Sequence, residues 1–240
     1  MSRSIFKGTL GNGDQERGAR HKPADTKSTE AAVKALSEEY ITSANASPDA
    51  DEDTPILWWL YGTIAEAFAA RIPDDADGQQ VLDGVVNALR RDCPQEIVNG
   101  LNTIYVARVV QALYLAGHNN LLLDLTEPIN SVEEFSYLHG TADDKLVLHV
   151  QGDFDSFKMI RNCRITHSGK VGEIDYCTDS RFDIHGTECP LVEASVRDCT
   201  FYFHHMDRES IRLKEQSLHN TYFVKDNKGE WERVEFEGQG

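Results

Sequence analysis

The feature that most constrains the fold of this 240-residue chain is a repeat of about 17 residues in its C-terminal half. The stretch N-C-R-I-T-H at 162–167 is followed by D-S-R-F-D-I-H at 179–185 and by D-C-T-F-Y-F-H at 198–204. Within each copy, apolar and polar residues alternate, which is the period of a β-strand. Three glycines share the same spacing: Gly152, Gly169 and Gly186.

Aligning the copies places their inward-facing residues, all apolar except Ser180 and His167, in three columns. The columns are Leu146, Cys163, Ser180 and Cys199; Leu148, Ile165, Phe182 and Phe201; and Val150, His167, Ile184 and Phe203. The residues between them form a mostly polar opposite face, with Val147, Arg164, Arg181 and Thr200 in one row and His149, Thr166, Asp183 and Tyr202 in another. One coil cannot bury its apolar side alone, whereas coils stacked about 4.8 Å apart share an interior. The pattern therefore predicts a β-solenoid, and an antiparallel meander with accidental similarity is the alternative.

Helical periodicity dominates the N-terminal half instead. Four apolar-faced segments with short connections predict a helical bundle domain over 28–123, after a polar arm over 1–27. A polar linker is expected over 124–144, and the solenoid with a C-terminal cap over 145–240. The expected class is α+β and multidomain. The linker and the last segment are the expected covers for the open ends of the solenoid.

Several coils carry a resemblance to a known type of domain. The matching pieces are Gly169-Lys170-Val171-Gly172, Asn162-Cys163-Arg164-Ile165 and Arg197-Asp198-Cys199-Thr200-Phe201. They resemble the short right-handed β-helix of the GXGXG type, known from the C-terminal domain of glutamate synthase and from formylmethanofuran dehydrogenase. The chain is most similar to uncharacterised archaeal proteins with a helical N-terminal part. The resemblance covers roughly residues 145–225 and implies a single-stranded solenoid that acts as a scaffold without catalytic residues.

Charge and hydropathy argue against two classes of partner. The formal net charge is -16, from 40 acidic and 24 basic residues, so the chain as a whole repels phosphate backbones. The densest basic stretch, near 17–27, is short and interrupted by acids, so nucleic-acid binding is not expected. No apolar run approaches the roughly 20 residues of a membrane span, and the N-terminus lacks a signal-peptide core. We expect a cytoplasmic protein with free thiols. Its acidity fits either a salt-loving microbe or an ordinary acidic cytosolic protein.

Cysteines and histidines gather in the C-terminal half without the spacing of a metal site. No C-x-x-C or H-x-x-x-H pair occurs there, and the predicted strands place Cys163 and Cys199 inward but His185 outward. No cofactor is therefore expected. The weak surface candidates for a metal are His204 and His205.

The remaining candidates lie on the predicted outer face and in one helix. Arg164, Arg181 and Asp183 match the Arg/Asp clusters of carbohydrate-active β-helix enzymes, although a solvated charged face is the simpler interpretation. Trp58 and Tyr202 are candidates for interaction, since aromatic residues lead interface hot spots, although packing against the N-terminal arm or the first β-coil is the favoured interpretation for Trp58. The favoured function is a non-catalytic scaffold or interaction module that binds an unidentified protein or a second copy. The alternatives are a carbohydrate-active enzyme and a structural subunit of a larger redox complex.

Overall fold

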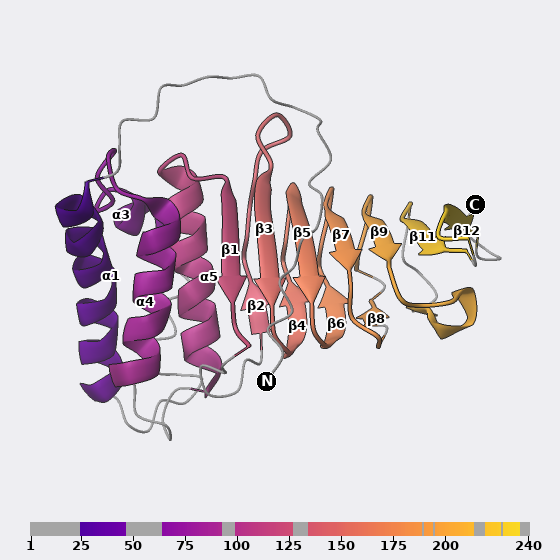
Figure 1. Cartoon of the computed structure of the whole chain (residues 1–240), viewed down its shortest axis with the longest axis horizontal. Coiled ribbons are helices and arrows are strands. Elements are labelled where there is room, and N and C mark those ends of the chain that lie inside the picture. The colour runs from indigo at the N-terminus through magenta and orange to yellow at the C-terminus, as the bar shows by residue number, and fades with distance from the viewer. Residues whose placement is uncertain are drawn as a thin grey trace.

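The structure is a computed structural model of the whole chain. It describes residues 25–46, 64–92, 99–126, 134–188, 190–193, 195–213, 219–226 and 228–235. The described residues comprise an N-terminal group of helices and a C-terminal β-solenoid of about four turns. Figure 1 shows the helices at one end of a row of strands and the C-terminal strands at the other end. The predicted mixed α+β class is confirmed, and the division into separate domains stays a prediction.

Capping interactions mark the start of one described helix and the end of another. Their bounds are α1 (Thr26–Ala46), α3 (Ile64–Ala69), α4 (Gly78–Asp92) and α5 (Asn99–Leu115). Asp77 precedes α4, and its carboxylate accepts hydrogen bonds from the backbone and side-chain nitrogens of Gln80, both at 3.0 Å. Gly117 has φ 96° after α5, where the amide of His118 donates to the carbonyl of Leu113 at 2.9 Å.

The strands form two sheets that run along the solenoid. Sheet A has the order β1-β3-β5-β7-β9-β11-β12, and sheet B has the order β10-β8-β6-β4-β2. The strands of sheet A are β1 (Asn120–Asp124), β3 (Leu146–Gln151), β5 (Cys163–Ser168), β7 (Arg181–Ile184), β9 (Thr200–Phe203), β11 (Thr221–Lys225) and β12 (Trp231–Val234). Those of sheet B are β2 (Glu134–Ser136), β4 (Phe154–Lys158), β6 (Val171–Asp175), β8 (Leu191–Val192) and β10 (Arg212–Leu213). Every pairing is parallel except β11 with β12.

The register of sheet A confirms the columns expected from the sequence. Leu148 pairs with Ile165, Ile165 with Phe182, and Phe182 with Phe201. The structure extends this column at both ends, to Leu121 and Tyr222. All of these side chains are buried, and the rings of Phe182, Phe201 and Tyr222 stack with centroids 5.2 Å apart. The antiparallel meander is therefore excluded for these strands.

The repeated glycines lie at one corner, where the backbones of successive coils approach closely. Gly169 has φ 141°, and a Cβ atom there would lie 2.1 Å from the carbonyl oxygen of Gly152. A Cβ atom at Gly186 would lie 2.2 Å from the carbonyl oxygen of Gly169. The 17-residue spacing of glycine thus follows from coil stacking as well as from the turn.

The strands begin earlier than the sequence pattern indicated. The sequence pattern predicts that the solenoid starts at residue 145, but β1 already pairs with β3 in parallel. The segment 124–144, expected to be a linker, contains β2, which pairs with β4. The period of 17 does not reach these strands, because 27 positions separate the paired residues Leu121 and Leu148.

Helices α4 and α5 cover the N-terminal end of the solenoid, whereas the sequence predicts the 124–144 segment as a cover. Gln111 of α5 donates to the carbonyl of His139 at 3.0 Å and accepts from its amide at 2.7 Å. Gln79 of α4 makes the same pair of bonds with Leu122 of β1, at 2.7 and 2.8 Å. Each side-chain amide thus makes the hydrogen bonds that the backbone of a further strand would make at the edge of the sheet. Arg108 of α5 adds hydrogen bonds to the carbonyls of Ser136 and Tyr137, at 2.7 and 2.9 Å.

Replacing Gln111 with methionine is expected to destabilise the fold by about 1–3 kcal/mol, because it leaves the polar backbone groups of His139 unpaired beneath α5. Methionine matches glutamine in size but lacks the amide. Urea unfolding of the variant and of Asn87→Met, on the exposed side of α4, measures the difference. Equal stability of the two variants would show that the amide does not replace a strand.

Candidate functional site

The fold brings four of the five interaction candidates together on the outer face of sheet A. Arg164 of β5 pairs in register with Arg181 of β7, and Asp183 of β7 pairs with Tyr202 of β9. These residues point away from the core because their neighbours Ile165, Phe182 and Phe201 point into it. Trp58, the fifth candidate, lies outside the described residues.

The guanidinium of Arg181 connects the charged and aromatic parts of this face. Its Nε and Nη2 atoms donate to the two carboxylate oxygens of Asp183, at 2.8 and 2.7 Å. The same guanidinium lies over the ring of Tyr202, 4.0 Å from the centroid. Arg164 approaches the same carboxylate from the neighbouring coil, at 3.9 Å. A bidentate pair combined with ring stacking fixes Arg181 in one conformation.

Aromatic residues continue the face toward the C-terminal end. The ring of Phe223 on β11 stacks on Tyr202 with centroids 4.7 Å apart, and Trp231 on β12 meets Tyr202 edge-on at 4.9 Å. Lys225 lies over Trp231, with its Nζ 5.2 Å from the ring centroid. We call the set Arg164, Arg181, Asp183, Tyr202, Phe223 and Trp231 the Arg181 cluster.

Histidines border the Arg181 cluster. The rings of His185 and His204 stack with centroids 3.6 Å apart, and His204 meets Trp231 edge-on at 4.8 Å. The Nε2 atom of His204 is buried without a hydrogen-bond partner, 4.0 Å from Asp183. His205 lies 6.4 Å from His204 between ring centroids. Over the described part of the chain, no three His, Cys, Asp or Glu residues are placed to hold a metal ion.

The electrostatics of the face suit binding better than proton transfer. Burial by itself would raise the pKa of the Asp183 carboxyl, but the nearby His204 ring and the guanidinium groups of Arg181 and Arg164 outweigh burial and lower that pKa to about 2. Asp183 is therefore a fixed anion at neutral pH. A general acid or base works best when its own pKa lies near the operating pH.

Acid is expected to destabilise the fold through His185. Burial and the neighbouring His204 lower its pKa from 6.5 to about 4, so the folded state favours the neutral ring. The unfolded chain binds the proton first, and stability falls as the pH drops below about 6.5 toward 4. His185→Gln should lose less unfolding free energy between pH 7.5 and pH 5 than the wild-type chain, as measured in urea. Equal losses in both proteins would contradict this assignment.

From β3 to β12, the outer face of sheet A is basic although the chain is acidic. Strands β3 to β12 carry four cationic side chains on this face, Arg164, Arg181, Lys225 and Arg233, and one carboxylate, Asp183. Because these cations come from four strands spread over 70 residues of sequence, no linear stretch reveals them. Folding thus creates a basic patch that a search for basic runs misses.

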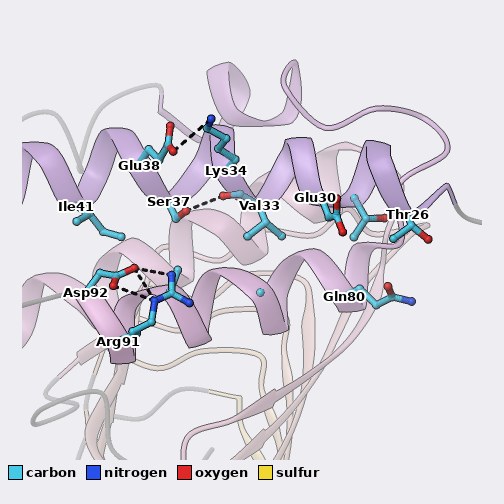
Figure 2. A pocket seen from close by; sticks show the side chains of 13 residues that line it. Thr26, Glu30, Val33, Lys34, Ser37, Glu38, Ile41, Gln80, Arg91 and Asp92 are labelled. Atoms are coloured by element: carbon cyan, nitrogen blue, oxygen red, sulfur yellow. Dashed lines mark hydrogen bonds and ion pairs between the residues drawn. The ribbon is translucent and has the colours of Figure 1, made fainter.

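A groove with a volume of 530 Å³ lies between α1 and α4, away from the Arg181 cluster. Figure 2 shows Val33 and Ile41 of α1 pointing toward α4, with the Lys34–Glu38 ion pair on the far side of α1. At one end of the groove, Arg91 pairs with Asp92 at 2.6 Å on α4. None of these residues was a candidate from the sequence, and both pairs are internal to one helix.

Comparisons with known proteins add no assignment. No protein-family model matches the chain, and searches of curated proteins and of solved structures return no match. None of the helices in the described part of the chain combines the length and hydropathy that crossing a bilayer requires.

Proposed function

We propose that this chain is a non-catalytic protein-interaction module and that the Arg181 cluster is its contact surface. The observation that carries the proposal is the Arg181 guanidinium, held between the Asp183 carboxylate at 2.7 Å and the Tyr202 ring at 4.0 Å. Tryptophan, tyrosine and arginine are the residues enriched at interface hot spots. Because these side chains are already ordered before a partner binds, binding costs less side-chain conformational entropy.

The same geometry gives less support to a carbohydrate-active enzyme. Glycosidases use two carboxyl groups that flank the bond, and on their outward faces strands β3, β5, β7, β9 and β11 carry only Asp183. Sugar binding also uses open aromatic faces, but Arg181 covers one face of Tyr202 and Phe223 stacks on the other. A structural subunit of a redox complex, inferred from the GXGXG resemblance, would have the same contact surface.

A cytoplasmic location belongs to this proposal. The support comes from three thiols inside the solenoid, Cys163, Cys177 and Cys199, which are buried and unpaired. Burial raises the pKa of the Cys163 and Cys199 thiols to about 12, so they fill space in the core without reacting.

Site-specific photo-crosslinking in the native cell tests the contact surface. A photoreactive amino acid at Thr200, outward and next to Arg181, should give a discrete adduct heavier than the chain alone. The same amino acid at Asn87 on α4 is the matched control and should give none. Combining the Thr200 label with Arg181→Ala and Tyr202→Ala should abolish the adduct. No adduct at Thr200, or equal adducts at both positions, would refute this contact surface.

A further inference from the structure

The outer face of sheet B carries the opposite charge from that of sheet A. Its acidic residues are Glu134, Asp155, Glu173 and Asp175, against Lys158 and Arg212. Glu134 is paired with Lys158 at 3.7 Å, whereas neither Asp155 nor Glu173 takes part in an ion pair among the described residues. One solenoid thus presents a basic face and an acidic face in different directions.

The two faces also share one spacing. Each coil contributes one strand to sheet A and one to sheet B, so the charges on both faces recur at multiples of about 4.8 Å. Arg164 and Arg181 lie on adjacent strands of sheet A. Glu134 and Glu173 lie two strands apart on sheet B, in the same column. A row of cations on one copy can therefore align with a row of carboxylates on another.

Exposed apolar side chains accompany both charged rows. On sheet A, 39% of Trp231 is exposed. At the end of β6, next to sheet B, 60% of Tyr176 is exposed. Leu191 of β8 is half-buried in the same column as Glu173. Such contacts supply the apolar area that surface ion pairs lack.

We propose that the partner is a second copy of this chain, whose sheet B docks its outer face on the outer face of sheet A. This inference rests on the proposed function of the Arg181 cluster. A two-fold contact of sheet A with itself is disfavoured, because it would bring Arg164, Arg181 and Arg233 of both copies together. Contact of sheet A with sheet B leaves one free face of each kind at the ends, so further copies can add.

Two double variants test the arrangement, and we call them the blocked variants because each one disables the charge of one face. Arg164→Ala with Arg233→Glu removes the charge of sheet A, and Asp155→Lys with Glu173→Lys reverses that of sheet B. Lys27→Glu and Glu66→Lys, exposed on α1 and α3, are controls that reverse a charge away from both faces. Circular dichroism confirms that each variant folds. Sedimentation up to ~1 mM protein then gives the weight-average mass.

The wild-type chain and both controls should rise above 27.0 kDa with concentration, and each blocked variant should remain at 27.0 kDa. An equimolar mixture of the two blocked variants should form a dimer and nothing larger, because it retains one intact pair of faces. A monomeric wild type, self-association of a blocked variant, or a monomeric mixture would overturn the proposal. A Thr200 photo-adduct with a different protein would then support the proposed contact surface and refute only the proposal that the partner is a second copy.

Discussion

Gly169→Ala is expected to destabilise the solenoid by about 4 kcal/mol or more, the largest effect of any single substitution considered. The Cβ atom would lie 2.1 Å from the Gly152 carbonyl oxygen and 2.6 Å from its carbon, and both are backbone atoms of the preceding coil. Relief therefore requires the two coils to separate, which breaks hydrogen bonds between β3 and β5. Urea unfolding followed by circular dichroism measures the effect.

Gly229→Ala is the matched control. Gly229 also has a positive φ, of 81°, but no atom lies within 4 Å of the position its Cβ would occupy. Only backbone strain is then added, about 1–2 kcal/mol. Similar losses at the two positions would mean that Gly169 is needed for its turn alone and that the coils do not stack as described.

Phe201→Ala is expected to reduce the unfolding free energy by about 3–5 kcal/mol. The ring is fully buried and stacks between Phe182 and Tyr222, with interplanar angles of 8° and 11°. Neighbouring coils are joined by backbone hydrogen bonds and cannot close the gap. The truncation therefore leaves a cavity inside the aromatic column.

Tyr202→Ala, one position along the same strand, separates burial from local strand propensity. Tyr202 points outward, so its removal is expected to reduce stability by about 1 kcal/mol while disrupting the Arg181 cluster. A larger loss at Tyr202 than at Phe201 would place the wrong face of β9 inside the solenoid.

The sequence is sufficient to predict the columns because the coils between Leu146 and Phe203 differ in length by at most two residues. A difference of none or two residues keeps the alternation of each strand aligned with that of its neighbour, because the side-chain period is two. This argument does not apply to the first strands, because the connections before β3 are longer. Leu121 and Leu123 alternate with exposed neighbours only over a short stretch, close behind a helix that is itself apolar.

The candidate site is predicted in part for the same reason. Arg164, Arg181, Asp183 and Tyr202 follow from the repeat, and the strand that carries Phe223 can be added to it after a longer coil. Trp231 does not follow from the repeat. Trp231 lies on β12, which runs antiparallel to β11 and places Trp231 opposite Lys225. The register of such a hairpin strand is set by its turn and not by the repeat. The covering role of Gln111 is also missed. Its signal is a polar residue among buried apolar positions of α5, where a side-chain amide indicates a backbone partner.

The central claim is that successive coils lie in parallel register, and NMR scalar couplings across hydrogen bonds test it most directly. Such couplings identify which carbonyl accepts each amide proton. The structure predicts that the Thr200 amide couples to the Ser180 carbonyl, the Thr221 amide to Cys199, and the His204 amide to Ile184, each across 2.9 Å. Coupling of the Thr200 amide to a carbonyl of an adjacent antiparallel strand would contradict the solenoid and every proposal built on its outer faces.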